Sequence, residues 1–157
     1  MMSLWWWKLW KLLHIVGVLG FLASHGASAA VALRLRKEQE AGRVRALLDL
    51  SASTRTWGHA ALLLLIVAGV ANGFVLHAWD EGWIWAAIVL LVVLLVLAFP
   101  LAVPYYKRVR AAVSLDGPGM PQDELVVLLR SRRPIVIAVV ETFGILLIAW
   151  LMIWKPF

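Results

Sequence analysis

The four histidines of this chain are its strongest candidates for chemistry, because imidazole binds metals and exchanges protons near neutral pH. His14 and His25 are eleven residues apart, and His59 and His77 are eighteen apart. At about 100° per residue, each spacing returns a helix to nearly the same face. The sequence therefore predicts two helices that each present two imidazoles in a row along one side.

The expected depths of the histidines indicate how these two helices pair. If the first helix descends through a membrane and the second returns, His14 and His77 lie near the outer boundary, and His25 and His59 lie in the inner half. Each pair could hold a haem b, with one axial imidazole from either helix. His59 is expected about 8 Å nearer the inner boundary than His25. One haem and two haems per chain both remain open.

Small, aromatic and basic residues near the histidines suit such a cofactor. Gly17 lies between His14 and His25 on their face, and Gly73 precedes His77 by one turn. Glycine allows a flat macrocycle or a neighbouring backbone to approach closely. Phe21 falls on the same stripe and could stack on a porphyrin edge. Basic side chains at the inner boundary could pair with haem propionates as planar donors, and these include Arg34, Arg36 and Arg55.

Glu141 is the other candidate for chemistry, because it lies inside the last apolar segment, where an acid is costly unless it is neutral or paired. Its expected depth is close to that of His25. It is therefore a candidate proton relay or a partner for the second nitrogen of an imidazole. A protonated glutamate that bonds a neighbouring helix is the structural alternative. Asn72, in the second apolar segment, is expected to make a packing hydrogen bond.

Other metal chemistry is less favoured. A zinc or copper ion needs converging ligands, and each histidine row spreads over more than about 15 Å. The chain has no cysteine, which excludes disulfides, thiolate metal sites, cysteine nucleophiles and c-type haem attachment. Each histidine also has a structural interpretation, since an imidazole near a membrane interface can simply satisfy its own polarity.

The composition indicates that the solvent of this chain is lipid. Hydrophobic residues make up 63% of its 157 residues and charged residues 15%, against about 45–50% and about 25% in soluble proteins. A mean hydropathy of +0.87 cannot be buried in so small a globule. A soluble enzyme, a secreted disulfide scaffold and a disordered tail are therefore excluded. The net charge of +6 is explained by membrane topology and anionic lipid rather than by nucleic-acid binding.

Four apolar segments reach the length of about 20 residues that crosses a bilayer. They cover about residues 10–33, 58–78, 83–103 and 134–154. Pro100 and Pro104 mark the expected end of the third, and Pro134 suits the first turn of the fourth. The segments around residues 37–50 and 121–132 are each expected to form a short helix. The predicted fold is all-α, a four-helix membrane bundle that forms one domain over residues 1–157.

The basic residues predict the orientation of this bundle. Twelve of the fifteen lie between the first two spans or between the last two, whereas the link between the second and third carries only Asp80 and Glu81. By the positive-inside rule, both termini face the outer, periplasmic side of a bacterial cytoplasmic membrane. The first segment is interpreted as a retained helix rather than a cleaved signal peptide.

The segment Lys11–Gly17 reads KLLHIVG and is followed by small residues and by Arg34-Leu35-Arg36. This start resembles a broad superfamily of small bacterial membrane proteins over roughly residues 8–80. The superfamily includes predicted integral membrane proteins, copper-resistance-D-like domains and the four-helix membrane protoporphyrinogen oxidase of haem synthesis. The resemblance implies that His14 is functional, as a b-type haem ligand. His25, His59 and His77 do not match the oxidase pattern, which favours a separate haem-binding branch.

Together these features predict a cytochrome b-like protein that transfers electrons within the membrane. Two imidazole ligands would leave no open coordination position, which favours electron transfer over oxygen activation. The expected partners are membrane lipid, a quinone or periplasmic electron donor, and a second copy of the chain. Two alternatives remain: a protoporphyrinogen-oxidase-like enzyme acting on a porphyrin, and a transporter or assembly factor for copper or another small solute.

Overall fold

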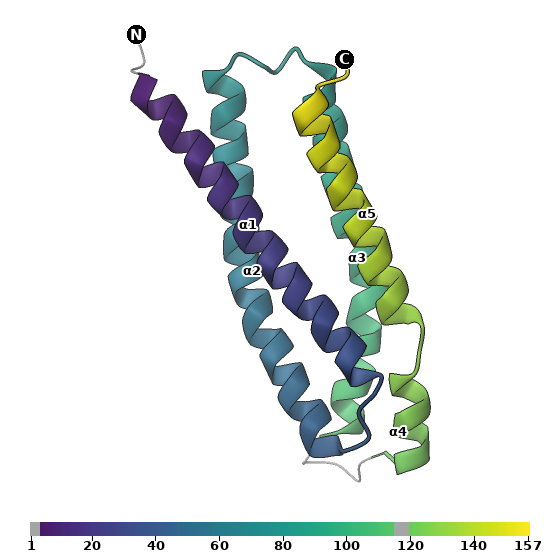
Figure 1. The fold of residues 1–157 in the computed structure, drawn as a ribbon. Helices are drawn as coiled ribbons and strands as arrows, with labels where there is room; N and C mark the ends of the chain where they lie inside the picture. Colours follow the sequence, from purple (N-terminus) through teal and green to yellow (C-terminus); the bar gives the residue numbers. More distant parts are fainter. Residues whose placement is uncertain (1–3, 115–119) are drawn as a thin grey trace.

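The computed structural model describes residues 4–114 and 120–157, and these ranges are all-helical (Figure 1). Four helices are long and a fifth is short. Their bounds are Leu4–Leu35 for α1, Ala41–Val75 for α2, Gly82–Ala112 for α3, Gln122–Leu129 for α4 and Arg133–Trp154 for α5.

Within the described ranges, four helical segments are long and apolar enough to cross a membrane, as predicted. They are Trp5–Leu35, Ala41–Val75, Gly82–Ala112 and Gln122–Trp154, and the mean hydropathy of their most apolar windows runs from 1.7 to 3.2. At about 1.5 Å per residue, even α5 is long enough for a hydrocarbon core of about 30 Å. These spans indicate a multi-pass membrane protein.

Helix α2 is longer than predicted. The expected short helix at residues 37–50 is not separate, because α2 runs from Ala41 through Val75 without a break. The polar stretch in its middle satisfies its hydroxyls on its own helix: Ser53 donates to the Leu50 carbonyl and Thr54 donates to the Ser51 carbonyl. Hydroxyl groups bonded in this way are compatible with a continuous helix.

Helix α3 also continues where the sequence predicted an end. It passes through Pro100 and Pro104 and stops only at Ala112. Each proline removes one backbone donor and so leaves a carbonyl four residues earlier, on Val96 and on Pro100, without its usual helical bond. Membrane helices tolerate such interruptions where neighbouring helices support them, and α3 packs along α5. The prediction that the prolines end this span was therefore wrong.

The helices form two packed pairs. Helix α1 packs along α2 and α3 packs along α5, whereas the pairs meet mainly through α1 and α5. Small residues allow the close contacts within pairs: Gly17 faces the Leu65 backbone, and Gly144 faces the Leu94 side chain. Both termini lie at one end of the bundle, here called the termini end, and the opposite end is called the α4 end (Figure 1).

The best-buried part of the described chain is a cluster at the α4 end. Helix α4 contributes Leu125 and Leu129, which are 2% and 0% exposed and pack among residues of α1, α2 and α3. The other fully buried members are Leu35, Val44, Tyr105 and Val109. The predicted short helix at residues 121–132 is confirmed as α4, and its apolar face explains why it folds back onto the bundle.

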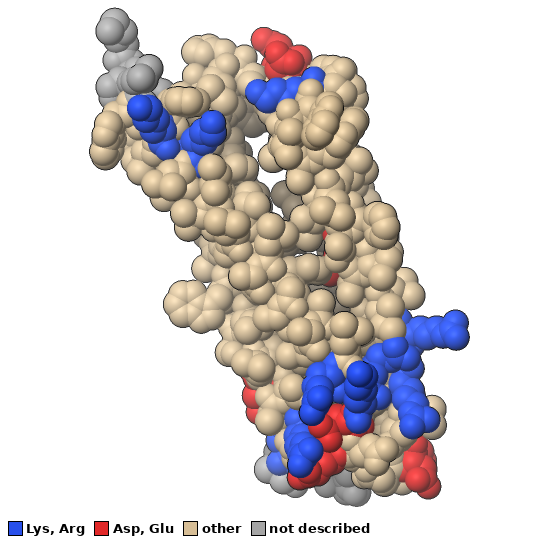
Figure 2. Space-filling view, viewed as in Figure 1, with Lys and Arg blue, Asp and Glu red and all other residues tan. Residues whose placement is uncertain are grey.

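The charged side chains on the face seen in Figure 2 lie mostly at the α4 end, with a smaller group at the termini end. Arg45 donates to the Val113 carbonyl, and Arg110 pairs with Asp49 at 2.9 Å. Between the two ends few charged side chains show, and this face is hollowed between the helix pairs (Figure 2). In the link between α1 and α2, the backbone N–H of Gln39 donates to Glu38 and lowers the pKa of that carboxyl.

Candidate functional site

A cavity of about 540 Å³ lies between the two helix pairs, toward the α4 end. All four long helices line it, because the pairs α1–α2 and α3–α5 meet mainly through α1 and α5 and leave space between them. Apolar side chains make most of the wall. The polar and aromatic residues of the lining include Phe21, Ser24, His25, Ser51, Arg55, His59, Phe99, Tyr106, Lys107 and Glu141.

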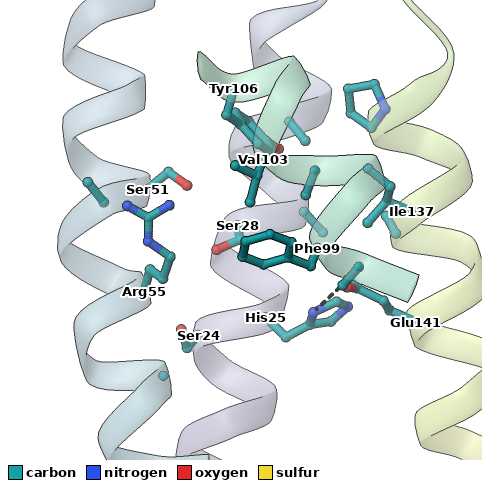
Figure 3. Close-up of a pocket in the computed structure, with 18 of the residues that line it drawn as sticks. Ser24, His25, Ser28, Ser51, Arg55, Phe99, Val103, Tyr106, Ile137 and Glu141 are labelled. Carbon is teal, nitrogen blue, oxygen red and sulfur yellow. Dashed lines mark ion pairs between the residues drawn. The ribbon is translucent and has the colours of Figure 1, made fainter. Parts of the chain in front are cut away.

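His25 and Glu141 meet inside this cavity (Figure 3). The Nδ1 atom of His25 in α1 lies 3.3 Å from Oε2 of Glu141 in α5, and the side chains are 18% and 23% exposed. The Nε2 atom of His25 is buried without a hydrogen-bond partner among the described residues. The matched depths expected from the sequence thus correspond to a direct contact between the two side chains.

The His25 ring is also held from its own helix. Phe21, one turn earlier in α1, stacks on it with ring centroids 6.4 Å apart and an angle of 22° between the planes. The imidazole is therefore oriented on one side by an aromatic ring and at Nδ1 by a carboxylate. Carboxylate–histidine pairs of this kind fix the tautomer and raise the basicity of the other ring nitrogen.

His59 lines the same cavity from α2. Its side chain is exposed, and it makes no hydrogen bond within the part of the chain that the structure describes. The two histidines expected to form the inner pair, His25 and His59, therefore contribute to one site.

His14 lies in the packed contact between α1 and α2 instead. Its Nδ1–H donates to the Leu65 carbonyl at 3.0 Å, and its ring lies against Gly69. It is absent from the cavity lining. His14 is thus positioned by helix packing, with one ring nitrogen already satisfied.

His77 does not continue the row of His59, and this prediction was wrong. Helix α2 ends at Val75, and His77 adopts a left-handed conformation with φ 50°. The backbone N–H of Ala78 donates to the Gly73 carbonyl and that of His77 donates to the Phe74 carbonyl. This pattern terminates helices, usually with glycine at the left-handed position. The helical periodicity therefore stops before His77, whose side chain is exposed.

The glycines expected to admit a macrocycle face protein atoms. A methyl added to Gly17 would lie 2.6 Å from the Leu65 backbone nitrogen, and one added to Gly73 would lie 2.7 Å from the Trp79 ring. Both glycines therefore provide close packing, of helix on helix at Gly17 and of the α2–α3 link at Gly73. The sequence argument allowed either a macrocycle or a backbone as the neighbour of each glycine. In the structure, the Leu65 backbone lies beside Gly17 and the Trp79 ring lies beside Gly73.

Of the predicted propionate partners, Arg34 and Arg55 lie in different places in the structure. Arg55 in α2 lines the cavity, whereas Arg34 lies exposed in the last turn of α1 and is not part of the lining. Asn72 differs from expectation as well. Its Oδ1 atom is buried and accepts no hydrogen bond from any described residue, so the predicted packing bond is not made through that atom.

Sequence reasoning missed the wall that α3 contributes. Phe99, Val103, Tyr106 and Arg110 all line the cavity, and Tyr106 and Arg110 lie beyond the predicted end of the third span. Their spacing of four, three and four residues is that of one helix face. Extending the helical periodicity through Pro100 and Pro104 would have found them.

No three His, Asp or Glu side chains of the described ranges converge as a site for a bare metal ion. A haem needs only one or two axial ligands from the protein, so the pair of cavity histidines suits it better than it suits an isolated ion. The buried, unpartnered Nε2 of His25 is the group that a haem iron would satisfy.

Comparison with protein families, with curated proteins and with solved structures finds no match for this chain.

Proposed function

We propose that this protein binds one haem b in the cavity between its helix pairs, with His25 and His59 as axial ligands, and transfers electrons within the membrane. The observation that carries the proposal is the state of His25. Its Nδ1 contacts Glu141 at 3.3 Å, and its Nε2 is buried with no partner in the described ranges. Metal-ligating histidines commonly have a carboxylate on the second ring nitrogen.

The cavity supports this proposal by its size and walls. Its volume of about 540 Å³ falls within the range of about 300–1,000 Å³ for pockets that enclose organic ligands. Phe21 and Phe99 offer aromatic faces, and the small side chains of Ala52 and Ala98 leave room in the cavity. When bound, the haem iron would carry one electron by cycling between its ferric and ferrous states. Glu141 would hold the proton on Nδ1 of His25, and the surrounding helices would exclude water.

The packing favours one haem over two. An outer haem would need His14 and His77 to face each other across α1 and α2. However, Gly17 and Leu65 bring these helices into backbone contact, and His77 lies in a turn beyond α2. His14 is accordingly assigned to helix packing. Membership of the superfamily suggested by the motif around His14 stays a prediction.

We further propose that both termini face the periplasm and that the α4 end faces the cytoplasm of a bacterium. Basic residues at the α4 end (Figure 2) support this orientation through the positive-inside rule. The expected electron donor is a quinone or a periplasmic donor. A second copy of the chain could cover part of the apolar surface of α3, which is exposed at Val89 and Val96.

The first test is the absorption spectrum of the detergent-purified protein, oxidised and dithionite-reduced, with haem quantified per chain. We expect one haem per chain and a sharp Soret and α-band on reduction. His25→Ala and His59→Ala should each remove the bis-imidazole spectrum, whereas the matched control His14→Ala should retain it. A featureless visible spectrum, in protein expressed with sufficient haem supply, would contradict the proposal.

An enzyme that acts on a porphyrin is the second candidate, and it is favoured by one observation. The cavity is lined from both α2 and α3, whose main packing partners are α1 and α5, so a bulky ring would find its way in between these two helices. The test is the fluorescence of protoporphyrin formed from protoporphyrinogen in membranes that contain the protein and a quinone. Turnover that survives in His25→Ala and His59→Ala would favour this candidate over the cytochrome.

A further inference from the structure

One side of the cavity lies between α2 and α3, whose main packing partners are α1 and α5. Helices α2 and α3 are joined by a short link at the termini end and touch at the α4 end, where Asp49 pairs with Arg110. Between these two ends, each packs mainly on a different partner, α1 or α5. In Figure 3, Phe99, Val103 and Tyr106 of α3 lie across the cavity from Ser51 and Arg55 of α2. Because α2 and α3 are both long and apolar enough to cross a membrane, a ligand that entered between them would come from lipid rather than from water.

Charge is distributed unevenly along this opening. At its α4 end the cavity is lined by the three cations Arg55, Lys107 and Arg110. Arg110 is paired with Asp49 at 2.9 Å. Arg55 and Lys107 have no acidic partner among the residues that the structure describes, and the one carboxylate of the lining, Glu141, is occupied by His25. Two unpaired cations therefore lie at one end of an otherwise mostly apolar opening.

This combination is complementary to an amphiphile that carries carboxylates. Leu62, Leu95 and Phe99 line the apolar part of the cavity, and a planar or acyl body placed there would leave water and contact apolar walls. A carboxylate at the α4 end would gain charge-assisted hydrogen bonds, which are about twice as strong as neutral ones. A guanidinium binds a carboxylate with two parallel donors, and an ammonium binds it as a point charge.

We infer that the cavity takes a carboxylate-bearing amphiphile sideways from the bilayer, between α2 and α3, with its carboxylates held by Arg55 and Lys107 at the α4 end. The choice of haem as this amphiphile rests on the proposed function. Haem carries two propionates on one edge, so this arrangement would direct that edge toward the α4 end and the iron toward His25 and His59.

The proposed binding of carboxylates by Arg55 and Lys107, here called the anchor, is tested by comparing haem with its dimethyl ester, in which both carboxylates are masked. Each is titrated into haem-free protein in nanodiscs, for the wild type, for the double variant Arg55→Gln/Lys107→Gln and for the control Arg34→Gln/Arg108→Gln. The control removes the same charge from residues outside the lining. We expect the first double variant to weaken haem binding about tenfold or more, with little change for the ester or in the control.

Three outcomes would overturn the anchor: an equal loss for haem and ester, an equal loss in the control variant, or no loss at all. If the wild type binds neither porphyrin, the proposed function fails on its own. A spin-labelled fatty acid, which carries one carboxylate, then serves as the probe. The inference stands if Arg55→Gln/Lys107→Gln releases this probe and falls if it does not.

The lateral opening is tested with a spin label, for which the cysteine-free chain is already a clean background. Ala98→Cys places the label on the cavity wall, and Val96→Cys places it on the exposed surface of the same helix. We expect both labels to collide with oxygen, which dissolves in lipid, rather than with a water-soluble nickel chelate. Haem should reduce the collisions at Ala98→Cys only. Collisions of the Ala98→Cys label with the nickel chelate would overturn the entry from lipid.

Discussion

Gly17 of α1 lies directly against the backbone of Leu65 in α2, so close that a methyl on Gly17 would come within 2.6 Å of the Leu65 nitrogen. The two helices are therefore in contact between the levels of His14 and His25. A ligand cannot occupy this level of the α1–α2 contact. The histidine that remains available on α1 is His25, which points across the bundle to α5.

Gly17→Ala should destabilise the protein. Overpacking a tight contact costs about 1–3 kcal/mol, which exceeds the roughly 0.8–1.0 kcal/mol that alanine gains over glycine in a helix. The measurement is the free energy of unfolding in detergent. Gly26→Ala is the matched control, because a methyl there meets nothing within 4 Å, and it should leave stability unchanged or raise it. Equal effects of the two substitutions would show that this helix contact is loose.

Glu141→Gln should retain haem but raise its midpoint potential. The carboxylate on Nδ1 makes the imidazole of His25 a stronger donor, which favours the ferric state, and an amide makes it a weaker one. We expect a rise of tens of millivolts, since about 59 mV corresponds to a tenfold change in a one-electron equilibrium. Potentiometric titration measures this shift. Thr142→Val, at the exposed neighbouring position, should leave the potential unchanged. An unaltered potential in Glu141→Gln would assign the acid to packing alone.

Leu129→Ala should weaken the cluster at the α4 end. Leu129 is 0% exposed, and truncating a buried leucine costs about 2–5 kcal/mol. Val127 on the same short helix is 73% exposed, so Val127→Ala should cost much less. Thermal unfolding of both variants, or protease sensitivity of the segment around α4, provides the measurement. Comparable losses would mean that α4 does not pack on the bundle as described.

The orientation can be measured with single cysteines, since the natural chain has none. Asp80→Cys lies in the α2–α3 link at the termini end, and Asp123→Cys lies in α4. If the positive-inside rule holds, a membrane-impermeant maleimide added to intact spheroplasts should label Asp80→Cys and spare Asp123→Cys. Both should react after the membrane is permeabilised. The reverse pattern in intact cells would invert the proposed topology.

Much of the fold followed from local properties of the sequence. Hydropathy over windows of about 20 residues predicted four spans, because the cost of exposing backbone to lipid makes long apolar helices nearly obligatory. The predicted ends of the helices were less accurate. Pro100 and Pro104 would end many soluble helices, but α3 continues through both as it packs on α5. The left-handed turn at His77 likewise ends α2 where periodicity alone would have extended it.

The sequence by itself determined the solvent, the helical class and the segments that carry the titratable groups, because hydropathy and helical periodicity act over neighbouring residues. Only the tertiary structure decided that His25 meets Glu141, that His59 shares their cavity and that His14 bonds to Leu65. Which face of a helix meets a neighbour depends on how the helices pair. That pairing is set by contacts between residues far apart in the chain, such as Gly17 with Leu65 and Gly144 with Leu94.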